Sequence, residues 1–170
     1  MFSALVLVQS DLNGAPSSEA IVRTLSALVP AAIEGVVRDV ALASQSKNDD
    51  LSRIADHAGC EYVEAPGDDL IGSGLAVLKE PRILILRAGR VPEHGFVGEL
   101  ANFASYQAQQ CALLLEAPNS LLTRIIPRFS RASGVVGPRA ALAGVKPNIA
   151  ALARAVASPI VFKSRAIGAD

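Results

Sequence analysis

The sequence is poor in the residues that build disulfide frameworks and metal clusters, and its apolar runs are short. It has 170 residues but only two cysteines and two histidines. Cys60 and Cys111 lie far apart and match no metal-ligand spacing, so we expect two reduced, mostly buried thiols. The first apolar run ends at Val8 and follows no basic segment, which excludes a signal-peptide core or a transmembrane helix there. These absences favour a soluble, cytoplasmic protein with no transmembrane segment.

The chain also has no excess of either positive or negative charge. Lys plus Arg and Asp plus Glu number 16 each, so the formal net charge is zero. Nucleic-acid carriers normally show a basic excess or stripe, and we therefore expect no nucleic-acid partner. Charged residues make up 19% of the chain and hydrophobic residues 51%, although much of that hydrophobic excess is alanine. The apolar surplus predicts a surface shared with a protein partner or with another copy of the chain, as in a homo-oligomer.

What the chain does contain is a regular alternation of strand-like and helix-like segments. Strands are expected at 3–8, 36–43, 61–65, 82–86, 111–115 and 160–162, helices at 18–28, 49–57, 70–78, 120–130 and 148–157, and a turn followed by a helix at 92–106. Pro30 is expected to end or kink the first helix, Asp49 or Asp50 to cap the second, and the segment 135–142 is ambiguous. Such alternation with short connections favours a three-layer α/β/α fold around a mostly parallel sheet. Because no linker-like segment divides the chain, residues 1–170 are expected to form a single domain.

The most informative segment is Arg82 to Arg90, which reads R-I-L-I-L-R-A-G-R. Its four consecutive aliphatic residues are typical of a strand covered on both faces, and the residues after such a strand usually face a ligand crevice. The loop that follows, Arg87-Ala88-Gly89, contains no carboxylate that could bind a divalent cation. Arg87 and Arg90 could bind phosphate directly through a bidentate fork; alternatively, they extend from the strand end into solvent or pair with Glu93.

Four segments together resemble the GT-A domain of family 2 glycosyltransferases, and in particular a bacterial subgroup of that family. They read A-L-V-L-V-Q-S-D-L-N from Ala4, I-V-R-T-L-S-A-L-V-P-A-A-I-E-G-V-V-R-D-V-A-L-A-S from Ile21, I-A-D-H-A-G-C-E-Y-V-E-A-P-G from Ile54 and I-L-I-L-R-A-G-R-V-P from Ile83. The resemblance is strongest over residues 3–105 and fainter beyond, where the chain is shorter than the subgroup implies. It implies a Rossmann-like domain that binds a nucleotide-diphospho-sugar at the ends of its strands.

The resemblance also implies where functional carboxylates should lie, and this chain departs from the pattern at most of those positions. Ser44 stands where the family has an aspartate that contacts the base, and the loop that begins with Gln45 retains only Asp49, which a helix cap explains equally well. The segment 87–89 replaces the metal-binding carboxylates that neutralise the diphosphate. Later, the segment 145–148 matches the stretch that supplies the family's catalytic base but has no carboxylate.

The candidate nucleotide-binding residues are those at the expected strand ends: Gln9, Ser10, Asp11, Asn13, Ser44, Gln45, Asp49, Arg87, Gly89 and Arg90. No catalytic residue and no metal ligand is assigned, and Mn²⁺ or Mg²⁺ is expected only if the site is active. The leading hypothesis is a pseudoenzyme, a glycosyltransferase-like domain that acts as a non-catalytic binding or assembly subunit. Two alternatives stay open, so enzymatic activity is undecided at this point. One is a metal-independent glycosyltransferase with a nucleotide-sugar donor, and the other is a nucleotide-sensing protein.

Overall fold

The computed structural model describes residues 1–10, 14–107, 109–118, 130–144 and 148–169. Its strands are β1 (Phe2–Val8), β2 (Val37–Ser44), β3 (Glu61–Glu64), β4 (Arg82–Arg87), β5 (Arg90–Pro92), β6 (Ala112–Glu116), β7 (Ala132–Pro138) and β8 (Ile160–Gly168). Its helices are α1 (Ser18–Ser26), α2 (Val29–Ile33), α3 (Asp49–His57), α4 (Leu70–Val77), α5 (Phe96–Tyr106), α7 (Arg139–Leu142) and α8 (Ile149–Ala155).

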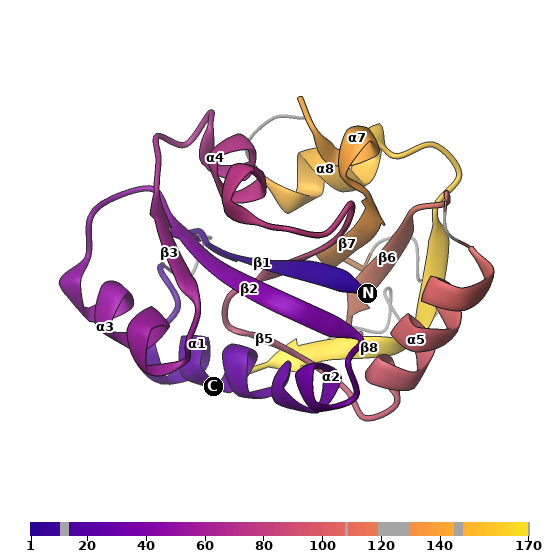
Figure 1. The fold of residues 1–170 in the computed structure, drawn as a ribbon, viewed down its shortest axis with the longest axis horizontal. Helices are drawn as coiled ribbons and strands as arrows, with labels where there is room; N and C mark the ends of the chain where they lie inside the picture. Colours follow the sequence, from indigo (N-terminus) through magenta and orange to yellow (C-terminus); the bar gives the residue numbers. More distant parts are fainter. Residues whose placement is uncertain (11–13, 108, 119–129, 145–147, 170) are drawn as a thin grey trace.

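The strands form an eight-stranded sheet in the order β3-β2-β1-β4-β7-β6-β8-β5 (Figure 1). Strands β1 to β4 pair in parallel, and β6 is parallel to β8. Strand β7 runs antiparallel between β4 and β6, and β5 is antiparallel to β8 at the edge. Helices α1, α2, α3 and α5 lie on one face of the sheet, and α4, α7 and α8 lie on the other. The expected three-layer α/β fold is therefore confirmed, and its sheet is mixed, with four parallel and three antiparallel strand pairings among the described residues.

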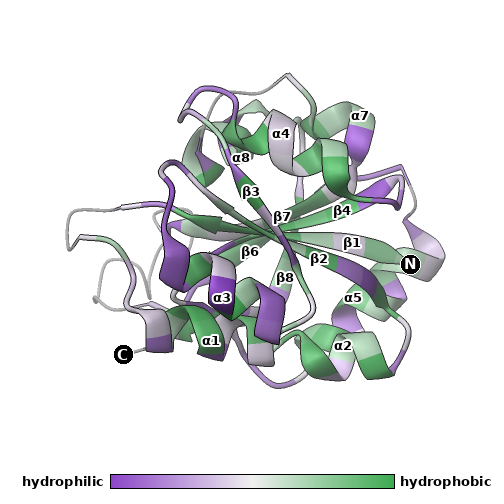
Figure 2. Cartoon of the chain, turned by 60° about the vertical axis from the view of Figure 1, so that its left-hand side comes forward, coloured by the Kyte–Doolittle hydropathy of each residue, from purple (hydrophilic) through white to green (hydrophobic). Residues whose placement is uncertain are grey.

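The core consists of two apolar layers, one on each face of the central strands. Successive side chains of a strand point to opposite faces. In β4, Ile83 and Ile85 therefore pack toward α4 and α8, whereas Leu84 and Leu86 pack toward α1 and α5. All four are buried, because helices cover both faces. Figure 2 shows hydrophobic residues concentrated along these strands.

Two helix boundaries differ from those expected. Pro30 does not end the first helix but lies in the first turn of α2, where its missing N–H would have no partner in any case. The cap of α3 is Asn48, whose side-chain oxygen accepts from the backbone N–H groups of Asp50 (2.9 Å) and Leu51 (3.2 Å). The prediction of an Asp49 or Asp50 cap was wrong by one position, and both aspartates instead lie in the first turn.

The second half of the sheet contains the strands that sequence patterns described least well. The ambiguous segment 135–142 contains most of β7 and then α7. The last strand is much longer than 160–162, because β8 pairs with β6 as far as Ala166 and with β5 as far as Gly168. Strand β5 was not expected at all. The helix expected at 120–130 lies outside the described residues, apart from Ser130, which is not helical.

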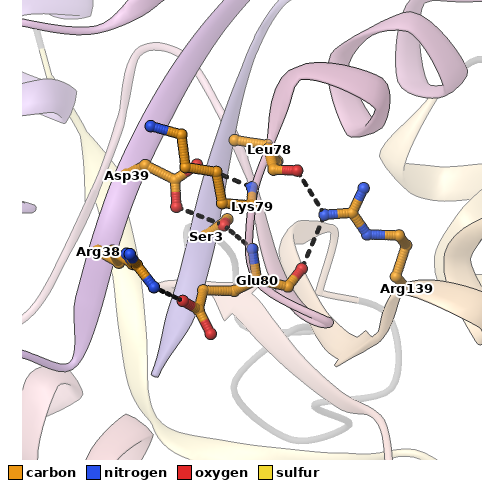
Figure 3. A network of polar contacts seen from close by, with 7 residues as sticks. All are labelled: Ser3, Arg38, Asp39, Leu78, Lys79, Glu80 and Arg139. Carbon is orange, nitrogen blue, oxygen red and sulfur yellow. Dashed lines mark hydrogen bonds and ion pairs between the residues drawn. The ribbon is translucent and has the colours of Figure 1, made fainter.

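A polar network connects the parallel strands β1 and β2 with the segment before β4, at the edge where these strands begin (Figure 3). The Ser3 hydroxyl donates to Asp39 and accepts from the backbone N–H of Glu80, and Asp39 also accepts from the N–H of Lys79. Arg139 donates to three carbonyl oxygens of α4 and the α4–β4 connection, at 2.6 to 2.8 Å. These bonds hold the scaffold at the edge opposite to the candidate site. Within the described ranges, no helix is long and apolar enough to cross a bilayer.

Candidate functional site

Polar side chains gather at the edge where the parallel strands end. Gln9 follows β1, Ser44 ends β2, Arg87 ends β4 and Glu116 ends β6. Because β2 and β4 pair with opposite sides of β1, the order of the strands reverses there. In open α/β sheets, ligands bind in the crevice outside the carboxyl ends at such a reversal. The sheet topology therefore marks this edge as the candidate site.

Two hollows open at this edge and share Gln9 and Arg87 as a common wall. The larger, of about 1200 Å³, lies between the ends of β1, β2 and β4 on one side and β6, β8, α8 and the start of β7 on the other. The smaller, of about 490 Å³, lies between the start of α1, the β4–β5 turn and the ends of β6 and β8.

The carboxylate of Glu116 joins the two arginines of the β4–β5 segment. Its Oε1 lies 3.0 Å from Arg90 Nε and 3.7 Å from Arg87 Nη1. The side chains are 10% (Glu116), 13% (Arg87) and 21% (Arg90) exposed, so water screens these ion pairs only weakly. The expected partner, Glu93, accepts instead from the backbone N–H of Arg165. A carboxylate from β6 therefore contacts both guanidiniums, because β7 and β6 follow β4 in the sheet.

Gly89 shapes the turn between these arginines. Its φ of +78° lies in the left-handed region, which glycine adopts without strain. Its N–H donates to the hydroxyl of Thr24 (3.0 Å), which in turn donates to the carbonyl of Ala20 in α1. A Cβ atom at position 89 would lie 3.0 Å from Pro16 Cβ. The turn is therefore pressed against the start of α1, which explains Gly89 by packing.

The other residues expected at the site fall into three groups. Ser10 and Gln45 line the larger hollow together with Gln9 and Arg87. Ser44 is buried and donates to the carbonyl of Ser46, and the exposed Asp49 lies in the first turn of α3, so neither lines a hollow. Asp11 and Asn13 lie outside the described residues.

Three residues of the site were not found from the sequence: Glu116, Arg131 and Arg154. Glu116 directly follows the apolar run of β6, so the rule that drew attention to Arg87 would also have found it. Arg131, just before β7, and Arg154, on α8, are exposed and line the larger hollow with Arg87. No pattern in the sequence links Arg87, Arg131 and Arg154, because they come from distant segments. Among the described residues, no aspartate or glutamate lines this larger hollow.

The described donor set does not fit a hard divalent cation. Mg²⁺ and Mn²⁺ favour oxygen ligands, usually carboxylates and water. The one carboxylate among the described residues of the two hollows is Glu116, and two guanidiniums already contact one of its oxygens. In the part of the chain that the structure describes, no group of three or more His, Cys, Asp or Glu side chains could hold a metal. The chemistry that this edge offers is the binding of an anion by guanidinium groups.

No protein-family model matches the chain, and no curated protein matches it. Solved structures do match it. A complex of glucosyl-3-phosphoglycerate synthase from Mycobacterium tuberculosis with Mn²⁺, UDP-glucose and phosphoglyceric acid has a TM-score of 0.61 and 14% identity, over 85% of this chain and 59% of that one. Its complex with Mn²⁺, UDP and phosphoglyceric acid has a TM-score of 0.60 and 15% identity, over 85% and 58%. A mycobacterial protein has a TM-score of 0.62 and 14% identity, over 85% and 55%.

The chain thus spans 55 to 59% of the length of these solved structures. At such low identity the likeness shows the fold, and the fold is that of GT-A glycosyltransferases.

Proposed function

We propose that this chain is a glycosyltransferase-like domain that does not transfer sugar and acts as a non-catalytic binding or assembly subunit. The fold supports the first half of this statement. The second half is supported chiefly by one observation, the double contact of Glu116 Oε1 with Arg87 and Arg90. In a metal-dependent transferase, a cation at this edge stabilises the charge that develops on the departing diphosphate.

Glu116 is poorly suited to take over such a role. To bind a metal or accept a proton from an acceptor hydroxyl, its carboxylate would have to leave two largely buried guanidiniums. Breaking a buried ion pair by removing one partner typically costs about 3–5 kcal/mol, because the remaining charge stays buried without compensation. The ion pair therefore opposes both catalytic uses of this carboxylate.

A second function, metal-independent sugar transfer, is favoured by a different observation. Arg87, Arg131 and Arg154 line the larger hollow, and among its described residues no acidic side chain offsets them. Fixed guanidiniums can stabilise charge on a diphosphate leaving group in place of a cation. Such a reaction would still need a base for the acceptor hydroxyl.

The release of UDP from UDP-glucose, measured with Mn²⁺ or with EDTA, separates the two functions. UDP-glucose is a substrate to test because similar solved structures contain it. A non-catalytic domain gives no release above the buffer rate under either condition, and Glu116→Gln gives none either. Steady release in EDTA would support the metal-independent transferase. Steady release that requires Mn²⁺ would overturn the proposal.

A further inference from the structure

The larger hollow carries positive charge that no described acidic residue of the hollow neutralises. Arg131 and Arg154 are exposed at its rim, and within the described part of the chain no ion pair engages either side chain. Arg87 lies in the wall between the two hollows. Both Arg87 and Arg90 contact Glu116. Guanidinium groups bind phosphate oxygens through paired N–H donors, so this arrangement suits a phosphate better than a neutral sugar.

The floor of the same hollow is apolar. Leu113 of β6 and Val161 of β8 are partners across two parallel strands, and Leu115 lies two residues further along β6 on the same face. Val161 is 45% exposed, although it sits within the sheet. A volume of about 1200 Å³ far exceeds what an inorganic ion needs. Floor and volume together indicate a ligand that has an apolar or aromatic part as well as its charge.

We propose that the larger hollow binds an organic phosphate directly through Arg87, Arg131 and Arg154, without a metal ion, and that the charge of Glu116 sets the affinity. The proposal rests on the proposed function and names the ligand class of that site. Glu116 acts as an internal anion that competes with the ligand for Arg87. Removal of its charge weakens this competition, so the affinity for phosphate should rise.

Isothermal titration calorimetry in EDTA tests the arginines. The probes are UDP, octyl phosphate and inorganic phosphate, which distinguish a nucleotide, an alkyl phosphate and a bare ion. We expect UDP or octyl phosphate to bind more tightly than inorganic phosphate, because only they cover the apolar floor. The double variant Arg131→Gln/Arg154→Gln should bind about a hundredfold more weakly, or roughly tenfold for each guanidinium–phosphate hydrogen bond that it removes. Both positions are exposed, so the variant should fold.

The matched control is Arg53→Gln/Lys79→Gln, which removes two exposed positive charges that do not line the hollow. Its affinity should stay within about twofold of wild type, since neither side chain lines the hollow and exposed charges are screened by salt. An equal loss of affinity in both double variants would mean that only the net charge matters, and would overturn the site. Failure of all probes to bind the folded wild-type protein would overturn it as well.

Glu116→Gln tests the second half of the proposal. We expect UDP or octyl phosphate to bind several-fold more tightly, provided that circular dichroism shows a folded variant. If the variant does not fold, Glu116→Asp serves instead; its shorter side chain draws the carboxylate back from Arg87, so it should also bind more tightly than wild type. Unchanged or weaker binding by folded Glu116→Gln would overturn the role of Glu116. Sugar transfer by a protein that binds phosphates as described would instead overturn the proposed function and leave the arginine site intact.

Discussion

Glu116 determines the electrostatics of the sheet edge, because one of its oxygens contacts two guanidiniums. The segment after β4 holds two cations, Arg87 and Arg90, and its loop has no carboxylate of its own, so Glu116 of β6 offsets part of their charge. The two cysteines are a separate feature of the chain at this scale. The Cys60 and Cys111 thiols form no disulfide, as expected, but both are only half-buried. Burial raises the pKa of each thiol, which lowers its thiolate fraction and its reactivity.

At the residue scale, Glu116→Ala should destabilise the fold by up to about 3–5 kcal/mol, because it removes a carboxylate that contacts two largely buried guanidiniums. Urea unfolding followed by circular dichroism measures the loss. The control is Glu19→Ala, which removes an exposed i,i+4 pair with Arg23 and a charge in the first turn of α1, and it should cost about 1 kcal/mol or less. Similar losses in the two variants would show that burial adds nothing to the Glu116 contacts.

At the scale of elements, local signals worked where an element stabilises itself and failed where a neighbour stabilises it. The Ser17 cap of α1 and the apolar run of β4 are local features, and both elements were expected within a few residues of their observed bounds. Strand β7 contains Gly134, whose added Cβ would lie 3.1 Å from the carbonyl oxygen of Ile85. Glycine weakens a strand signal but permits this close approach, so only the packing explains the residue.

The cap of α3 gives a prediction at this scale. Asn48→Ala should destabilise the fold by about 1 kcal/mol, since two backbone N–H groups lose their acceptor. Asp49→Ala, one residue further on, should cost less, because Asp49 contributes a charge in the first turn, worth roughly 0.3–1 kcal/mol, and an exposed contact with Lys47 that adds little. Thermal and urea unfolding of both variants measures the difference. A larger loss for Asp49→Ala would mean that the aspartate is the cap.

At the scale of the whole molecule, the apolar surplus of the sequence is mostly accounted for by two buried layers. A part of it stays on the surface, since Val29 and Ile33 of α2 are 52% and 80% exposed. These two residues lie four apart on one helix and so share a face. Under the proposed function, this face would take part in assembly.

Static light scattering after size-exclusion chromatography tests that idea. We expect wild type to elute with a mass above the 17.6 kDa of one chain, and Val29→Glu/Ile33→Glu to shift toward it. Charges at these positions would have to be desolvated in an apolar contact, which is unfavourable. Glu34→Gln, at the exposed end of α2, is the control and should leave the mass unchanged. A wild-type monomer at high concentration would count against assembly through α2.

About half of the candidate site could be predicted from the sequence. Gln9, Gln45 and Arg87 were found because strand ends can be read from apolar runs, and parallel strands place those ends at one edge. Arg131 and Arg154 could not be found this way. Arg131 precedes β7, a glycine-containing strand whose sequence pattern was ambiguous. Arg154 lies on α8, an alanine-rich helix.

By itself, the sequence determined the alternation of strands and helices, the layered fold, and the absence of a carboxylate in the loop after β4. Those features follow from local periodicity and from residue identity. Only the tertiary structure decided that Glu116 meets Arg87 and Arg90, and that three distant arginines surround one hollow. The physical reason is that β7 runs antiparallel between β4 and β6 and so places the end of β6 at the same edge as the end of β4. That pairing rests on contacts between segments far apart in the chain, which no local pattern encodes.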